Sequence, residues 1–360
     1  MSEERPLTVV IAGVGLIGGS VAIGAKQHGL ASHVIGFDKS PGVLDAARGL
    51  GVIDQAELQL GSWVAEADLI VVASPSRTIP AVLEEILPYA REDAVITDVG
   101  SVKEPIVDSV HDPRYIGSHP MAGSEHAGVL NADAGLLENA IWALTPSPTT
   151  SETAQATLET FVRGIGARPL IISAAQHDRV VATVSHLPNV TAVALTKLVE
   201  NGEDSALKML LAAGGFRDLT RVASGDPVMS RDMIAANRDY LRDALHTLKT
   251  QLDELSKMLD EPEPLERELL QAKRVRDAIP IVRRSLLPAL YEIIVPVADR
   301  PGEFARITNA MADAEINIKD LEVLNIRESG GAVRLAFGTS NDLVAASSLL
   351  TQLGYSVRGS

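Results

Sequence analysis

The stretch LTVVIAGVGLIGGSVAIGAKQHGLASHVIGFD, residues 7–38, decides the fold that the sequence predicts. The apolar run Leu7–Ala12 leads directly into the glycine turn GVGLIG, and a helix-like segment of small residues separates that turn from a second apolar run, Val34–Phe37. Such glycines allow a tight turn, a close approach of the backbone to a pyrophosphate, and close packing of a helix on a strand. The N-terminus of the helix then faces the phosphate charge. We therefore predict a dinucleotide-binding βαβ unit.

Seven residues are predicted to contact the dinucleotide: Gly13, Gly15, Leu16, Ile17, Gly18, Asp38 and Ser74. Asp38 follows the second strand, twenty residues beyond Gly18, and Ser74 follows the expected strand Leu69–Ala73. A carboxylate at the Asp38 position accepts a hydrogen bond from a ribose 2′-hydroxyl and repels a 2′-phosphate. NAD is therefore the expected cofactor, with Lys39 beside Asp38 as the argument for NADP.

Composition excludes several classes of protein. The 360 residues suggest two or three domains, and the 46% of apolar residues is enough for sizeable cores. The net charge of −15 argues against general binding to nucleic acid or to an anionic membrane.

The absence of cysteine excludes a disulfide scaffold and a cysteine nucleophile, and it favours a reducing cytoplasm. Leu7–Ala25 is uncharged, as a signal peptide or membrane helix would be, but its five glycines fit the dinucleotide turn better.

The order of elements predicts three domains and a linker. The further candidate strands before residue 173 are Leu69–Ala73, Ala94–Thr97, Tyr115–Gly117, Ile141–Leu144 and Pro169–Ile172. Continuous apolar runs are typical of a parallel sheet with helices on both faces, so residues 1–172 are expected to form an α/β doubly wound dinucleotide-binding domain. Residues 173–260 have an all-α helical pattern, and 261–289 form a charged linker. Residues 290–360 follow the order β-α-β-β-α-β, which is typical of a small ferredoxin-like α+β domain.

A leucine seam marks the helical domain. Its members alternate spacings of four and three: Leu241, Leu245, Leu248, Leu252, Leu255 and Leu259. Such a seam packs either against the core of its own subunit or against a partner subunit. We favour the second alternative and expect a homodimer through this domain.

Two clusters that follow predicted strands are candidates for chemistry. The first, residues 98–103, contains Ser101, and the second, residues 117–126, contains His119 and Glu125. Strand carboxyl ends line the crevice of an open sheet, and a histidine there suits removal of a proton from an alcohol during hydride transfer. A turn with a capping serine and a structural histidine are the alternatives. No metal is expected, because the sequence lacks the ligand spacing of a metal site.

Two further clusters lie in the helical domain. The stretch SHLPN, residues 185–189, contains Ser185, His186 and Asn189. In the stretch GGFRDLTR, residues 214–221, Arg217 and Arg221 stand four apart and are expected on one helix face. Two guanidiniums there can clamp carboxylates. The alternative is a solvated face that pairs with neighbouring aspartates.

Together these motifs resemble the prephenate/arogenate dehydrogenase family of tyrosine biosynthesis. The resemblance rests on GVGLIGGS (13–20), DVGSVK (98–103), HPMAG (119–123), SHLP (185–188) and GFRDLTR (215–221), in family order over about residues 7–260. Residues 290–360 resemble an ACT domain, an amino-acid-sensing module, through DRPG (299–302) and INI (316–318).

The resemblance implies an NAD-dependent oxidative decarboxylation of prephenate to 4-hydroxyphenylpyruvate. It makes His119 the base or the hydrogen-bond partner at the substrate hydroxyl, with Ser101 as the residue that orients both the histidine and the hydroxyl. The implied substrate contacts are Ser185, His186, Asn189, Arg217, Arg221 and Glu125. Among them, Arg221 is implied to grip a substrate carboxylate.

Alternatives remain for the substrate and for the class of protein. Arogenate carries an ammonium where prephenate has a ketone; neutral Asn189 gives that ammonium no electrostatic pull, whereas Glu125 would. We therefore favour prephenate and keep arogenate as the alternative. A β-hydroxyacid dehydrogenase shares the domain order but not the His119 and Arg221 clusters, and a non-catalytic dinucleotide or amino-acid sensor needs no His119 beside Ser101.

The ACT-like domain implies regulation. Feedback inhibition is expected, with L-tyrosine as the effector and Asp299, Gly302 and Asn317 as the residues that bind it. A glycine turn before a helix lets backbone N–H groups approach an amino-acid carboxylate. A stabilising or dimerising domain is the alternative.

Overall fold

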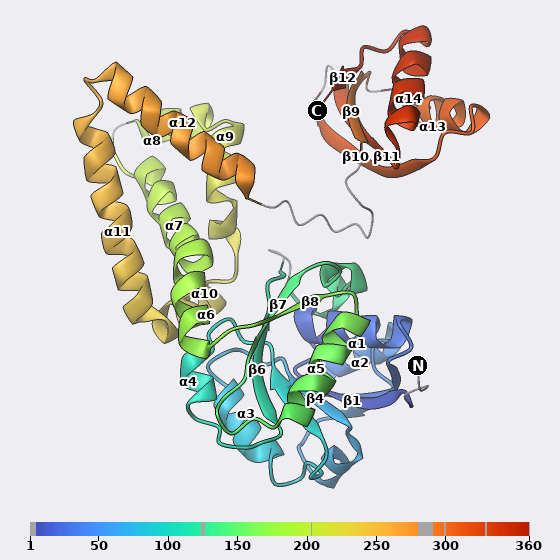
Figure 1. Cartoon of the computed structure of the whole chain (residues 1–360), viewed down its shortest axis with the longest axis vertical. Coiled ribbons are helices and arrows are strands. Elements are labelled where there is room, and N and C mark those ends of the chain that lie inside the picture. The colour runs from blue at the N-terminus through green and yellow to red at the C-terminus, as the bar shows by residue number, and fades with distance from the viewer. Residues whose placement is uncertain are drawn as a thin grey trace. The chain divides into compact units, whose positions relative to one another are not determined.

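The computed structural model describes residues 5–123, 127–202, 204–279, 291–298, 300–327 and 330–359. The chain divides into two compact units, Met1–Arg284 and Ser285–Ser360 (Figure 1). The expected domain classes are all present: an α/β sheet and a helical part in the first unit, and an α+β fold in the second.

A sheet of eight strands among the described residues organises the first unit, in the order β3-β2-β1-β4-β5-β6-β7-β8. The strands are β1 Leu7–Ala12, β2 Ala31–Phe37, β3 Gln55–Glu57, β4 Leu69–Val72, β5 Val95–Asp98, β6 Tyr115–Pro120, β7 Ile141–Thr145 and β8 Arg168–Ile171. β1 lies parallel to both β2 and β4, with Val9 opposite Val34 and Leu69. The chain therefore winds in one direction from β1 and in the other from β4, as the doubly wound prediction requires.

Two features of the sheet differ from the prediction. The edge strand β3 was not expected, because its three residues, Gln-Ala-Glu, carry no apolar run. β7 is antiparallel to β6, with Gly117 opposite Thr145. The connection between them contains two 3-10 turns, Val129–Asn131 and Ala134–Leu136. A parallel pair usually needs a crossover helix, so this connection reverses the strand direction.

Helices cover both faces of the sheet, and alternate residues of each strand supply two separate cores. Val9 and Ile11 of β1 pack with α1 Leu16–Gln27, α2 Pro41–Gly49 and α5 Glu152–Gly164. The intervening side chains of β1 and its neighbours pack on the opposite face with α3 Ile79–Ile86 and α4 Glu104–Val107. This double coverage explains why the strands are continuous apolar runs.

The helical part begins directly after β8. Its elements are α6 Ala174–Val181, a π-helical turn Ala182–His186, α7 Leu187–Glu200, α8 Ser205–Leu211, α9 Gly214–Thr220, a 3-10 turn Arg221–Ser224, α10 Pro227–Ala236, α11 Arg238–Lys257 and α12 Pro262–Ala278. In the predicted leucine seam, Leu241 of α11 is buried and Leu252 is 56% exposed, whereas Leu259 lies beyond the end of α11 and is 69% exposed. No helix in the described part of the chain combines the length and apolar character needed to cross a bilayer.

The second unit pairs a sheet with two helices. Its described elements are β9 Tyr291–Val297, α13 Glu303–Asp313, β10 Ile318–Arg327, β11 Gly330–Phe337, α14 Ser340–Gln352 and β12 Arg358–Gly359, with sheet order β10-β11-β9-β12. The predicted order of elements is confirmed. The last strand comes later than the expected Tyr355–Val357, because the Tyr355 hydroxyl donates to Glu303 Oε1 (2.7 Å) and only Arg358 and Gly359 pair with β9.

Candidate functional site

The predicted nucleotide turn lies where the sheet reverses its winding. Gly13 has φ +106°, and its N–H donates to the carbonyl of Phe37 (2.8 Å). A Cβ at Gly13 would lie 2.6 Å from the carbonyl carbon of Ala73, and a Cβ at Gly18 would lie 2.1 Å from the Gly13 oxygen. Gly15, in contrast, has no atom within 4 Å of a Cβ position. Two glycines therefore close the turn, and the third leaves open space beside the N-terminus of α1.

Asp38 lies at the carboxyl end of β2, beside this turn. Its Oδ2 accepts from the N–H of Val14 (3.2 Å), and its Oδ1 accepts from the N–H of Ser40 (2.9 Å). These bonds orient the carboxylate and leave further acceptor capacity on both oxygens. Ser74, at the end of β4, accepts from the Thr78 hydroxyl (3.1 Å). The structure thus brings the candidate cofactor residues to the carboxyl edge of β1, β2 and β4.

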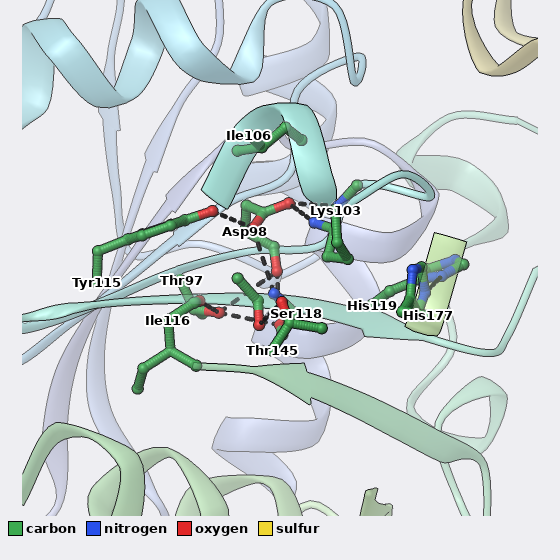
Figure 2. A network of polar contacts seen from close by, with 12 residues as sticks. Thr97, Asp98, Lys103, Ile106, Tyr115, Ile116, Ser118, His119, Thr145 and His177 are labelled. Carbon is green, nitrogen blue, oxygen red and sulfur yellow. Dashed lines mark hydrogen bonds and ion pairs between the residues drawn. The ribbon is translucent and has the colours of Figure 1, made fainter. Parts of the chain in front are cut away.

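A buried ion pair anchors the same edge at the end of β5 (Figure 2). Asp98 pairs with Lys103, and neither side chain is exposed. Asp98 also accepts from the Tyr115 hydroxyl (2.8 Å) and from the N–H of Gly100 (2.8 Å). Burial lowers the pKa of Lys103 against the opposing charge of Asp98, and burial raises the pKa of Tyr115 well above 10. The pair fixes the loop that carries Ser101.

Hydrogen bonds join β6 to the neighbouring strands β5 and β7 at Ser118, the residue before His119. The Ser118 hydroxyl donates to the backbone oxygen of Asp98 (2.6 Å) and accepts from Thr97 (2.9 Å) and from the indole of Trp142 (2.8 Å). Because Ser118 precedes His119 on β6, this network holds the strand that presents the histidine (Figure 2).

His119 contacts a second histidine that comes from the helical part. Its Nδ1 lies 2.9 Å from Nε2 of His177 on α6, and the two rings meet edge to face (Figure 2). His177 in turn bonds through Nδ1 to Oδ1 of Asp178 (2.7 Å). Sequence reasoning missed His177 and Asp178, and it also predicted that Ser101 orients His119. Within the described residues, no hydrogen bond joins Ser101 to His119.

His119 and His186 are both held neutral. Burial, followed by the nearby His177, Lys103 and His186, lowers the pKa of His119 well below 6.5. Burial lowers the pKa of His186 from 6.5 to about 4. An unprotonated imidazole can accept a proton, so His119 has the protonation state that a base requires.

His186 presents a donor. The amide nitrogen of Asn237 donates to the backbone oxygen of Asp178 (2.8 Å), and the same nitrogen lies 3.0 Å from Nδ1 of His186. Nδ1 must therefore be the acceptor and Nε2 must carry the hydrogen. This Nε2 is buried and has no partner among the described residues. Such an orphaned donor suits an anionic or carbonyl group of a ligand.

The remaining predicted substrate residues lie on the helical part. Asn189 donates to the backbone oxygen of Val222 (3.3 Å), while its buried Oδ1 has no partner in the described structure. Ser185 is exposed on the π-helical turn. Arg217 and Arg221 are exposed, but they do not share one α-helix: α9 ends at Thr220, and Arg221 begins a 3-10 turn. Glu125 lies outside the described residues.

The predicted effector residues belong to the second unit. Gly302 has φ +87° and caps α13, and a Cβ there would meet no atom within 4 Å. With its amide group rotated by 180°, Asn317 donates to the Ile318 oxygen (3.2 Å) and accepts from Lys319 Nζ (2.8 Å). Asp299 lies outside the described residues. No group of three or more candidate metal ligands occurs within the described ranges.

The glycine turn, the switch point of the sheet and a neutral histidine at the same edge define a dinucleotide-dependent oxidoreductase. Family profiles sharpen this class. One described as "Prephenate dehydrogenase, nucleotide-binding domain" matches residues 21–171, and one described as "Prephenate dehydrogenase, dimerization domain" matches residues 173–271. The chain belongs to the prephenate dehydrogenase family.

Individual relatives agree with this assignment. A prephenate dehydrogenase of Bacillus subtilis (strain 168) is 36% identical over 345 residues, which cover 93% of each chain. The crystal structure of prephenate dehydrogenase from A. aeolicus, in complex with hydroxyphenyl propionate and NAD+, has a TM-score of 0.73 and 30% identity, and covers 78% of this chain and 100% of that one. A Synechocystis arogenate dehydrogenase has a TM-score of 0.66 and 30% identity, with 75% and 99% covered.

Proposed function

We propose that the protein catalyses the NAD-dependent oxidative decarboxylation of prephenate to 4-hydroxyphenylpyruvate, in tyrosine biosynthesis. The observation that carries the proposal is the neutral His119 at the sheet edge that also holds the glycine turn. The relatives named as prephenate dehydrogenases support the choice of substrate.

The residues at the glycine turn fit NAD. The space beside Gly15 admits a pyrophosphate at the N-terminus of α1, and the Asp38 carboxylate faces the turn with acceptor capacity for a ribose hydroxyl. The NAD+ bound to the A. aeolicus enzyme supports this assignment. When bound, NAD+ supplies the hydride acceptor.

His119 holds the proton during the reaction. As the carbinol carbon gives up its hydride, Nε2 of His119 takes the hydroxyl proton, and the C–O bond gains double-bond character. The ring carboxylate then leaves as CO₂, and its bonding electrons make the ring aromatic. The proton returns from His119 to the phenolate oxygen, so the products are 4-hydroxyphenylpyruvate, CO₂ and NADH. Ser101, on the fixed loop after Asp98, is assigned to the same hydroxyl.

Substrate binding is assigned to the helical part. The orphaned Nε2–H of His186 suits a carboxylate or keto oxygen, and the exposed Arg217 and Arg221 supply positive charge for a dianion. Ser185 completes the proposed set on the helical part, and Glu125 is kept as the candidate partner of an arogenate ammonium. A dianion that is held at both ends would present its carbinol carbon to the nicotinamide. Such positioning lowers the activation free energy of hydride transfer.

Arogenate is the second candidate substrate. The free Oδ1 of Asn189 is an acceptor that an ammonium would satisfy, and the Synechocystis relative is an arogenate dehydrogenase. Following NADH absorbance with each substrate in turn separates the two. A higher kcat/KM for prephenate is the expected result, a higher value for arogenate would reverse the assignment, and turnover of neither would remove the proposal.

The proposal also covers the oligomeric state of the enzyme and its regulation. The exposed leucines of α11 and the family's dimerization domain support a homodimer through the helical part. The absence of cysteine supports a cytoplasmic location. The second unit is assigned as an ACT-like domain that binds L-tyrosine and inhibits the enzyme. Gly302 at the N-terminus of α13 offers backbone N–H groups to the amino-acid carboxylate. Asp299 and Asn317 are assigned to the ammonium.

A further inference from the structure

Asp178 is a buried carboxylate with a full set of donors. Its Oδ1 accepts from the backbone N–H of Lys103 (2.7 Å), and its Oδ2 accepts from that of Glu104 (2.8 Å). The same Oδ1 lies 2.7 Å from Nδ1 of His177. Because Oδ1 and Oδ2 already accept backbone hydrogens, the carboxylate acts as an acceptor toward the histidine as well. His177 therefore carries its hydrogen on Nδ1.

One tautomer then fixes the next. In a neutral imidazole, hydrogen on Nδ1 leaves a lone pair on Nε2, which accepts. It lies 2.9 Å from Nδ1 of His119, so that nitrogen must donate. Neutral His119 then has its lone pair on Nε2. The chain of contacts runs from Asp178 through His177 to His119 with one allowed direction for each hydrogen.

We propose that Asp178 and His177 are positioning residues that hold His119 in the tautomer whose Nε2 is the proton acceptor. The inference rests on the proposed role of His119 as the base. The opposite tautomer would place a hydrogen on Nε2, where it could not take a proton from the substrate hydroxyl. A carboxylate that orients a catalytic histidine through Nδ1 is known to matter in serine proteases; here a second histidine lies between the two groups.

The same chain balances charge once His119 accepts the proton. Lys103, His177 and His186 are the titratable groups that face His119 among the described residues, and all of them repel an imidazolium when protonated. Lys103 is compensated by Asp98. Asp178 supplies a negative charge on the other side of His177, to which it is bonded. No proton needs to leave His119, which returns its proton to the product oxygen.

Substitutions at His177 test the role without disturbing Asp178. His177→Gln keeps an amide oxygen near the position of Nε2, so it can still accept from His119. His177→Leu removes the acceptor. We expect kcat to fall by roughly 10²–10⁴-fold in His177→Leu, with KM within about threefold of wild type, and to fall by less than about tenfold in His177→Gln. His111→Leu, an exposed histidine on another loop, is the matched control and should leave kcat unchanged.

Asp178→Asn tests the outer member of the chain. An amide rotated to donate toward His177 would reverse both tautomers, so kcat should fall by a similar factor. Because this change also weakens the bonds from Lys103 and Glu104, its thermal unfolding must be measured beside its activity. A kcat loss at an unchanged NAD+ affinity supports the proposal.

Nitrogen NMR of histidine-labelled wild-type enzyme reads the tautomer without any substitution. The resonances of His119 are identified by their loss in His119→Asn. Protonated Nδ1 and unprotonated Nε2 are expected; the reverse pattern overturns the proposal. Wild-type kcat in His177→Leu overturns it too, provided that His119→Asn is inactive. If His119→Asn is itself active, the proposed function fails instead.

Discussion

Burial of His119 decides when the proposed base is ready. Its pKa lies well below 6.5, so the ring is neutral throughout the physiological range. His119→Asn should lower kcat by roughly 10²–10⁴-fold, the usual worth of general acid–base catalysis, because asparagine cannot take the proton. Stopped assays with saturating NAD+ measure the loss, and NAD+ binding followed by fluorescence is the control. A variant within threefold of wild type would remove His119 from the mechanism.

Asp38 carries the choice between the two nicotinamide cofactors. Val14 and Ser40 donate to different oxygens of Asp38, so Asp38→Asn keeps an acceptor for only one of these N–H groups while it removes the charge that repels a 2′-phosphate. The ratio of kcat/KM for NAD+ over NADP+ should exceed one in the wild type and fall by about tenfold, or ~1.4 kcal/mol, in the variant. A wild-type preference for NADP+ would show that Lys39 outweighs Asp38.

Some site residues were predictable and others were not. His119, Asp38 and the glycines each follow an apolar strand within a few residues, so local pattern identifies them. His177 is 58 residues from its partner His119, and it lies with Asp178 near the start of an ordinary amphipathic helix. No spacing rule links a strand end to a helix of another domain, which is why this half of the site needed the structure.

At the level of elements, the π-helical turn Ala182–His186 shapes the substrate side. Pro188 has no N–H to donate to the carbonyl of Val184, so the regular i→i−4 pattern cannot continue through this turn. The wider turn exposes Ser185 and buries His186 beside it. Single π turns occur frequently at functional sites, and proline gives this one a local cause.

Because His186 is buried in that turn, the folded protein is expected to lose stability in acid. Above pH 6.5 the ring is neutral in both the folded and the unfolded chain, so it makes no pH-dependent contribution to the free energy of unfolding. As pH falls below 6.5, the unfolded chain takes up a proton that the folded chain refuses until about pH 4. Stability should therefore fall by about 3 kcal/mol across this window.

Denaturant unfolding of wild type and His186→Gln between pH 7 and pH 4 checks the prediction. The two curves of free energy against pH should converge as the pH falls, because only the wild type has this histidine. Parallel curves across the whole window would mean that His186 titrates normally in the folded enzyme.

Sequence patterns predict where the strands lie, but not the direction of each strand or where a helix ends. Apolar runs located β1, β2 and β4 to β7, where most side chains on both faces are buried, and also β8, although Leu170 and Ile171 on that strand are exposed. They could not give the direction of β7, since an antiparallel and a parallel strand bury the same side chains. Arg217 and Arg221 were expected on one helix because four-residue spacing assumes a continuous α-helix, and α9 ends between them.

For the whole molecule, the second unit has its own core and carries none of the proposed catalytic residues. Deleting residues 290–360 should leave kcat unchanged and abolish inhibition by L-tyrosine, whose coupling is expected to be about 5–150-fold in the full chain. Gly302→Ala is the finer test, because its methyl group enters the open space where a ligand carboxylate would lie. Alanine is strained at φ +87°, so thermal unfolding of this variant is measured as the control. Initial rates with increasing L-tyrosine measure both variants.

The outcomes distinguish two origins of inhibition. Equal inhibition of full-length and truncated enzyme would place L-tyrosine at the active site, as a product analogue. A full-length enzyme insensitive to every aromatic amino acid would leave the second unit with a structural role.

The bonds from Lys103 and Glu104 to Asp178 cross the border between the two family profiles, residues 21–171 and 173–271. A gene recombined at that border would take His119 and its loop from one parent and His177, Asp178 and His186 from the other. Chimeras joined at that border keep the cofactor site of one parent intact. The contacts between His119 and His177 and between the loop and Asp178 then join residues from two different parents. A crossover placed after Asn237 would instead pass the whole hydrogen-bonded group to the offspring from a single parent.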